Sequence, residues 1–436
     1  MVLSSLFYRV ALISITAFTL ANCYTRPSAE SSATSPPKPT TEVSLSGSKK
    51  DRAKPYLGTF RLFLDNSFSM DGYVKKNTAY KQVLLELLNG ANIDMGDMTV
   101  QVFAVNNLIY PLDYTGKSVA FVNQITPENK NWKQGSVYNS DLIQIFENAL
   151  AEAKAGDITV VMSDCLYTGS NLDLAKQGMK GVFGLVSKKQ PFKAAIYQFK
   201  AEFHGTYVYP DEKKTDYLDG QARPFYVWIM GSPVSVNTFL ARVKPNVWPG
   251  YINAYVLSNQ LTNHFYTISS LEQIGRYQTP SDNTIDYAEL ETGTNSFQFS
   301  VAAQLPTEID ATYLRDVRNY TVSNAKFRVE KVIPLAGYAP KTTFAATEFN
   351  RVRKTTANYL LLVRTTGLFA DGAYNIRLIN HIPNWVSQSH TAKLEESIQP
   401  TKTYALLPLL QGVTAGFTST SLPPLADFSF HIEKNN

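Results

Sequence analysis

The sequence predicts an α/β domain, built as a doubly wound and mostly parallel sheet, followed by a β-rich, sandwich-like C-terminal domain. Between residues 56 and 245, apolar runs rich in Val, Ile and Phe alternate with segments of helical periodicity, as buried parallel strands and their covering helices do. Over residues 246–436, short alternating segments separated by Gly, Asn, Asp and Pro replace this pattern. The chain has 436 residues, and single cores usually stop growing at about 250–300 residues.

The N-terminus has the pattern of a secretory signal. Arg9 is followed by the apolar stretch VALISITAFTL, which is too short for a bilayer-spanning helix of roughly twenty residues. The end of this stretch and the residues after it, LANC (residues 20–23), resemble the lipobox of bacterial lipoproteins, in which the cysteine becomes the lipidated first residue. We therefore expect a lipoprotein signal peptide at residues 1–22 and a lipid on Cys23. A plain signal peptide with an incidental cysteine is the alternative.

Residues 23–55 are rich in Ser, Thr, Pro and charged residues, with too little apolar surface to offset the entropy of ordering them. We expect a disordered tether that lets the folded part work at a distance from a membrane. The predicted location is the bacterial cell envelope, exported and lipid-anchored. An outer membrane is favoured because Tyr24, and not Asp, follows Cys23. Lipidation of Cys23 would leave Cys165, the other cysteine of the chain, without a disulfide partner.

The elements of the α/β domain, residues 56–245, follow from apolar runs, helical spacing and turn residues. Strands are predicted at residues 59–65, 99–106, 157–164, 192–209 and 224–232, and helices at 78–90, after Ser140, at 171–189 and at 234–243. The segment 202–224 is longer than the usual connection between neighbouring strands. We expect it to project as a hairpin or loop near the sheet edge and to add contacts with a partner.

The elements of the C-terminal domain, residues 246–436, follow from alternation of apolar and polar residues. Strands are predicted at residues 297–305, 320–335, 359–366, 374–380 and 428–434, with one helix at 403–417.

Polar residues follow two of the predicted strands at the points where they end. The stretch FLDNSFSMDGY leaves the first strand, and VVMSD ends the strand at 157–164. Ligands of parallel sheets bind beyond the carboxyl ends of the strands, so the two sets of side chains are expected to lie close together. Asp65, Ser67 and Ser69 form an Asp-x-Ser-x-Ser pentad, and Asp164 ends the later strand.

This pattern resembles the von Willebrand factor type A family, whose Rossmann-like domain carries a metal-ion-dependent adhesion site. Asp65, Ser67 and Ser69 match the family's pentad, Asp164 matches its later aspartate, and Ser140 is the nearest match to its threonine. The family often has Gly in place of Phe68 and commonly has Gly in place of Cys165. The resemblance covers about residues 56–245.

The resemblance implies a divalent cation, Mg²⁺ or alternatively Mn²⁺ or Ca²⁺, at this site. Hydroxyls contact the metal in the family, the aspartates act largely through water, and an acidic side chain of a partner protein completes the shell. Oxygen ligands suit such hard cations. We therefore expect a binding protein and not an enzyme, acting in adhesion or in assembly of an envelope complex. The expected partners are an unidentified protein and, through the lipid anchor, a membrane.

Three alternatives stay open at the level of sequence. The pentad can be a strand-to-helix turn whose short side chains satisfy free backbone N–H groups, and Ser140 can be a helix N-cap. The protein can be a metal-dependent hydrolase at the same crevice, or a scaffold that has lost its metal. Cys165 is expected to be a small buried apolar residue.

Other functions have little support. The chain carries 41 Lys and Arg against 36 Asp and Glu, and its basic residues are scattered, which does not favour nucleic acid. Its five histidines show no zinc spacing, and there is no nucleophile elbow or phosphate-binding glycine loop.

Overall fold

A computed structural model describes most of the chain after the predicted tether. The described residues are 58–96, 98–138, 141–151, 153–210, 214–418 and 421–434. The predicted signal peptide, the lipidation site Cys23 and the tether lie outside them, as does the candidate ligand Ser140.

The α/β part is built on a seven-stranded sheet. Its strands, in spatial order, are β3 (Ile109–Leu112), β2 (Thr99–Val105), β1 (Thr59–Asp65), β4 (Ile158–Ser163), β6 (Thr215–Gly231), β5 (Lys193–Val208) and β7 (Tyr251–Ser258). The pairings β1–β2 and β1–β4 are parallel, whereas the other four are antiparallel. The sheet is therefore mixed, and its parallel part is narrower than the sequence analysis predicted.

The antiparallel half comes from a long hairpin. β5 pairs with β6 from Lys193↔Gly231 to Val208↔Thr215, so β6 begins nine residues before the predicted strand at 224–232. Two strands joined by a tight connection can pair only in antiparallel fashion. The expected projection within residues 202–224 is the outer half of this hairpin.

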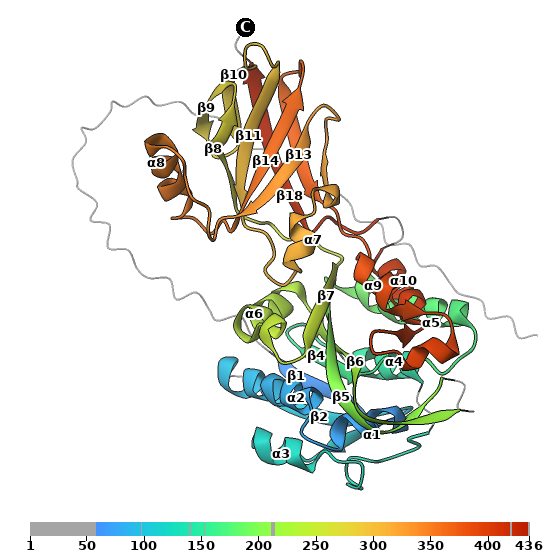
Figure 1. The fold of residues 1–436 in the computed structure, drawn as a ribbon. Coiled ribbons are helices and arrows are strands. Elements are labelled where there is room, and N and C mark those ends of the chain that lie inside the picture. Colours follow the sequence, from blue (N-terminus) through green and yellow to red (C-terminus); the bar gives the residue numbers. More distant parts are fainter. Residues whose placement is uncertain are drawn as a thin grey trace, which may run out of the picture. The chain divides into compact units, whose positions relative to one another are not determined.

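Helices cover both faces of the sheet (Figure 1). One face packs against α1 (Asp71–Val74), α2 (Ala79–Asn89), α3 (Ser118–Gln124) and α6 (Pro233–Val243). The other packs against α4 (Leu142–Ala151), α5 (Leu172–Lys189), α9 (Asn384–Ser389) and α10 (Leu406–Phe417). The alternation of side chains along a strand explains the two cores, since Leu62 and Leu64 of β1 lie in the first and Phe63 lies in the second.

The β-rich part contains two larger sheets. The four-stranded sheet consists of β13 (Arg328–Pro334), β14 (Tyr359–Thr366), β11 (Ser296–Ala303) and β8 (Tyr266–Ile274). The five-stranded sheet consists of β12 (Tyr320–Val322), β15 (Gly372–Leu378), β18 (Ala426–Lys434), β10 (Thr284–Glu289) and β9 (Arg276–Ser281). Both sheets contribute to one apolar core, as in a sandwich. The strand predicted at 320–335 is two strands in different sheets.

Shorter elements complete the described chain. They are the helix α7 (Ala311–Arg315), the small strands β16 (His390–Thr391) and β17 (Thr403–Tyr404), and the helical turns η1 (Phe68–Met70), η2 (Gly90–Asp94), η3 (Pro245–Val247), η4 (Val317–Asn319) and η5 (Leu394–Ile398).

The chain passes between the two parts more than once. The sequence predicts a boundary after residue 245, whereas β7 pairs with β5 in the large sheet and α10 packs in the same core as α4 and α5. The last strand, β18, then returns to the sandwich. α10 covers apolar side chains of this core, since the ring of Phe417 packs against Phe183 of α5 and against Phe192, which precedes β5.

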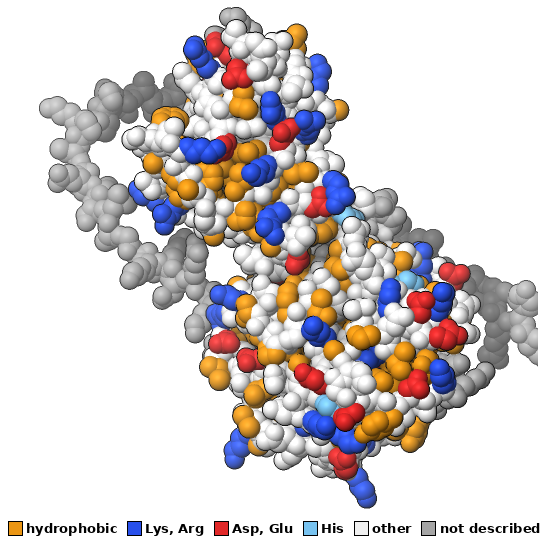
Figure 2. Space-filling view, viewed as in Figure 1, with side chains coloured by type: hydrophobic (Ala, Val, Ile, Leu, Met, Phe, Trp, Pro, Cys, Tyr) orange, Lys and Arg blue, Asp and Glu red, His pale blue; other side chains and the backbone are white. Residues whose placement is uncertain are grey.

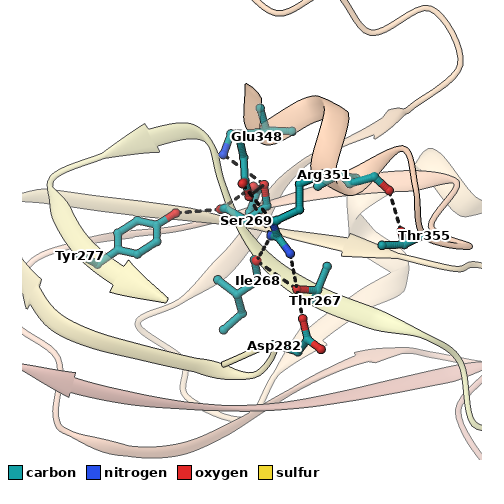
Figure 3. A network of polar contacts seen from close by, with 11 residues as sticks. Thr267, Ile268, Ser269, Tyr277, Asp282, Glu348, Arg351 and Thr355 are labelled. Carbon is teal, nitrogen blue, oxygen red and sulfur yellow. Dashed lines mark hydrogen bonds and ion pairs between the residues drawn. The ribbon is translucent and has the colours of Figure 1, made fainter. Parts of the chain in front are cut away.

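A polar network fastens α8 (Thr343–Val352) to the four-stranded sheet (Figure 3). Arg351 donates to the carbonyl of Ile268 in β8 at 2.9 Å and to Glu348 at 2.8 Å. Glu348 also accepts a 2.8 Å hydrogen bond from the Ser269 hydroxyl. Arg351 and Glu348 of α8 thereby form hydrogen bonds with polar groups of β8. The apolar side chains of α8 pack against the same strand.

Candidate metal centre

The strand order places the two predicted carboxylates together. Asp65 is the last residue of β1, and Asp164 directly follows β4. These strands are parallel neighbours with Leu64 opposite Met162, so both aspartates lie at the same carboxyl edge of the sheet. Ser67 and Ser69 lie in the turn that follows β1. The structure thus brings together four of the five predicted ligands, and the fifth, Ser140, lies outside the described residues.

The serine hydroxyls of the pentad do not cap the backbone of the turn. Asp65 Oδ1 accepts the Ser67 N–H at 2.9 Å, which is the ordinary turn role of an aspartate. Ser67 is the N-cap residue of η1, yet its side chain caps no backbone N–H. Its Oγ lies 3.1 Å from the Oγ of Ser69 instead. The turn interpretation therefore accounts for Asp65, whereas the two serine hydroxyls face each other and the carboxylates and cap no backbone N–H.

Both carboxylates are buried and are held by hydrogen bonds. Asp65 is 2% exposed and Asp164 is 7% exposed. The Ser163 hydroxyl donates to Asp65 Oδ2 at 2.7 Å, and the Leu166 N–H donates to Asp164 Oδ1 at 3.0 Å. These bonds fix the orientation of the carboxylates and leave further lone pairs on each.

Burial disfavours the ionised form of both aspartates, and the charge of Asp65 adds to this effect at Asp164. Burial and then the charge of Asp65 raise the pKa of Asp164 to about 6, against an opposing hydrogen bond from Ser69. Burial also raises the pKa of Asp65, although its hydrogen bonds with Ser67 and Ser163 oppose the shift. Within the described part of the chain, no Lys or Arg pairs with either carboxylate. A cation between them would remove this penalty.

The donor set fits a hard divalent cation. Two carboxylates and two hydroxyls supply only oxygen ligands, which Mg²⁺, Mn²⁺ and Ca²⁺ prefer. No group of three or more His, Cys, Asp or Glu side chains suited to a metal occurs among the described residues. The candidate centre is a different kind of site, because half of its described ligands are hydroxyls.

Asn66 and Lys133, which the sequence did not identify, hold the turn in place. Asn66 is fully buried, and its Nδ2 donates to the carbonyls of Trp132 at 2.8 Å and Gln134 at 3.0 Å. Its Oδ1 accepts a 3.0 Å bond from Asn106. Lys133 donates to the Asn66 carbonyl at 2.9 Å and pairs with Asp71. Residues 132–134, in the loop before α4, thus hold the turn of the candidate site in place.

Cys165 behaves as the small buried residue that the sequence analysis expected. It is fully buried, burial raises the pKa of its thiol, and Trp228 donates its indole N–H to the sulfur at 3.3 Å. Its φ of 54° lies in the left-handed region, which glycine adopts at no steric cost. This conformation gives a physical reason for glycine at this position in the family that the sequence resembles.

The outer surface gives little further indication of a ligand. On the face in Figure 2, Lys and Arg side chains are interspersed with Asp and Glu. Among the described residues, no helix has both the length and the apolar character that crossing a bilayer requires.

The chain was also compared with known proteins. No protein-family model, curated protein or solved structure matches it, so the candidate centre stands on its own geometry.

Proposed function

We propose that this protein is a cell-envelope lipoprotein that binds a protein partner through a divalent metal ion at the edge of its seven-stranded sheet. Asp65, Ser67, Ser69 and Asp164 would hold the ion, with Ser140 as a fifth ligand. The supporting observation is the pair of buried carboxylates beside two serine hydroxyls that have no capping role. The resemblance to von Willebrand factor type A domains supports the same assignment.

The bound cation would supply an electrophilic position that accepts a carboxylate of the partner. This chain's residues set up that position. Ser163 and the Leu166 N–H orient the aspartates, while Asn66 and Lys133 hold the turn in shape. The role of these residues is binding and orientation, which suits adhesion or assembly of an envelope complex.

Calorimetric titration of the purified protein with Mg²⁺ and Mn²⁺ tests the proposal. We expect about one equivalent of Mn²⁺ per chain, and loss of that binding in Asp65→Asn and in Asp164→Asn, because each removes a carboxylate charge from the site. Asp113→Asn, at an exposed position of the same domain, is the matched control and should bind as the unaltered protein does. Circular dichroism verifies that each variant is folded.

Two results would refute the metal site. One is the absence of binding by the unaltered protein at millimolar Mn²⁺. The other is binding that survives in both aspartate variants, which would place the ion elsewhere.

A further inference from the structure

A cavity of about 360 Å³ adjoins the candidate metal centre. Its volume is at the lower end of the range for small-ligand pockets, about 300–1,000 Å³. Ser67 and Ser69 belong to both its lining and the candidate centre. The hairpin of β5 and β6 (Figure 1) contributes Thr206, Val208 and Thr215 to the same lining. A ligand bound to the metal would therefore meet this cavity directly.

Among the residues that the structure describes, no charged side chain lines the cavity. Its remaining wall consists of uncharged residues, among them Phe68, Val137, Tyr138, Leu166 and Tyr209. Phe68 and Tyr138 stack with their ring centroids 5.3 Å apart, and Tyr138 is 68% exposed. An exposed aromatic stack beside a polar centre is a suitable surface for an apolar side chain.

Charges near the centre favour an acidic ligand. Lys133 lies beside Asp65, since its Nζ donates to the carbonyl oxygens of Asn66 and Ser67 at 2.9 and 3.2 Å. Arg223 is 4% exposed and lies over the ring of Tyr207 at 4.3 Å. A divalent cation would balance the two aspartates, and Asp71 already pairs with Lys133, so Arg223 would remain in excess. The surroundings would then attract a carboxylate.

We propose that the partner presents a short segment in which an acidic residue is adjacent to a large apolar residue. The carboxylate would bind the metal, and the apolar side chain would occupy the cavity between the Phe68–Tyr138 stack and the hairpin. This inference rests on the proposed metal-dependent binding and adds a specificity pocket to it. Thr206 and Val208 are then specificity-determining residues.

Capped tetrapeptides Gly-Asp-X-Gly, with X as Phe, Leu, Ser or Lys, test this pocket. Their affinities for the Mn²⁺-loaded protein can be measured by competition calorimetry, with EDTA as the metal-free arm. We expect the Phe and Leu peptides to bind at least about tenfold more tightly than the Ser and Lys peptides, the lower end of discrimination by a hydrophobic pocket. A Gly-Asn-Phe-Gly peptide should bind weakly, because it lacks the carboxylate.

Two hairpin variants isolate the pocket from the metal. Thr206→Trp fills the cavity from an exposed position, and Val208→Asn makes its wall polar without adding a carboxylate that could itself bind the metal. Both should reduce the preference for Phe over Ser to about one while leaving Mn²⁺ affinity unchanged. Tyr217→Ala, an exposed aromatic of β6 outside the cavity lining, is the control and should keep the preference.

The outcomes separate the two proposals. Failure of the unaltered protein to bind Mn²⁺ would refute the proposed function. Normal Mn²⁺ binding with equal affinity for all four peptides, with no peptide binding at millimolar concentration, or with a preference that persists in both hairpin variants would refute the pocket alone.

Discussion

At the scale of single residues, some side chains of the candidate centre can be recognised in the sequence and others cannot. Asp65, Ser67 and Ser69 are recognisable because they are close in sequence and follow an apolar strand. Asn66 and Ser163 are the sequence neighbours of Asp65 and Asp164, respectively, but no sequence pattern marks them as part of the site. Asn66 acquires its role from carbonyls 66 and 68 residues away, and such pairings are invisible without the fold.

Replacing Asn66 by Ala tests how much its buried hydrogen bonds stabilise the turn. The change removes three hydrogen bonds of a buried network, although the Asn106 amide and the Trp132 and Gln134 carbonyls each keep another partner. We expect the free energy of unfolding to fall by about 2–4 kcal/mol, since each buried hydrogen bond contributes about 0.5–1.5 kcal/mol. Urea denaturation measures the loss, and Mn²⁺ titration of the folded variant should show weakened binding.

Asn107→Ala is the matched control for this measurement. Asn107 is the next residue after Asn106 and is exposed, so its replacement should change the free energy of unfolding by no more than about 0.5 kcal/mol. Equal urea midpoints for the two variants would show that Asn66 does not support the turn.

At the scale of elements, the sequence predicts where strands occur better than whether neighbouring strands run parallel or antiparallel. The strands at 59–65, 99–106 and 157–164 agree with β1, β2 and β4 to within one residue at each end, because continuous apolar runs identify buried strands. Whether neighbouring strands run parallel is not encoded in periodicity. The hairpin of β5 and β6 therefore made the sheet mixed where helices between strands had suggested a parallel one.

The packing of α10 on α5 depends on glycine. A Cβ on Gly412 would lie 2.2 Å from the carbonyl oxygen of Lys176, so Gly412→Ala should separate the helices and lower the free energy of unfolding by about 1–3 kcal/mol. In Gly181→Ala, nothing lies within 4 Å of the added Cβ. That change should stabilise α5 by up to about 1 kcal/mol, from helix propensity alone. Urea unfolding of the pair measures both shifts, and a stabilised Gly412→Ala would contradict this account of the interface.

The attachment of α8 predicts a dependence on pH. Burial tends to raise the pKa of Glu348, but hydrogen bonds from Arg351 and Ser269 outweigh it and hold the pKa below its ordinary value of 4.5. A lowered pKa stabilises the folded state above the unfolded value, and this stabilisation is lost as pH falls through the folded one. Glu348→Gln should therefore lower the free energy of unfolding at pH 7 and have little effect near pH 3.

The expected size at pH 7 is below about 1 kcal/mol, because solvent screens a pair whose Arg351 side chain is 44% exposed. Glu330→Gln is a suitable control, since its partner Arg328 is 72% exposed and the pair fastens no helix. A Glu348→Gln effect that is equal at both pH values would indicate a packing role in place of an electrostatic one.

At the scale of the whole molecule, the two parts are joined by an exchange of segments and not by a single linker. Residues 384–417 leave the sandwich to cover the large sheet, and β18 completes the sandwich afterwards. The sequence predicted the helix at 403–417 but not its location. An apolar helical face shows that a helix is buried without showing which sheet it covers, so a linear division of the chain was the natural expectation.

This exchange predicts that residues 58–258 do not form a stable unit alone. Without α10, Phe183 and Phe192 lose their contacts with Phe417, whose ring centroid lies 6.0 and 5.7 Å from theirs. The uncovered apolar face should bind a hydrophobic dye and promote association, and the fragment should unfold at lower urea than the full chain. Joining residues 382–418 to the fragment through a flexible linker should reverse both effects, whereas the same segment carrying Gly412→Ala should do so poorly. A monomeric fragment with no dye binding and the urea midpoint of the full chain would show that the large sheet does not need this cover.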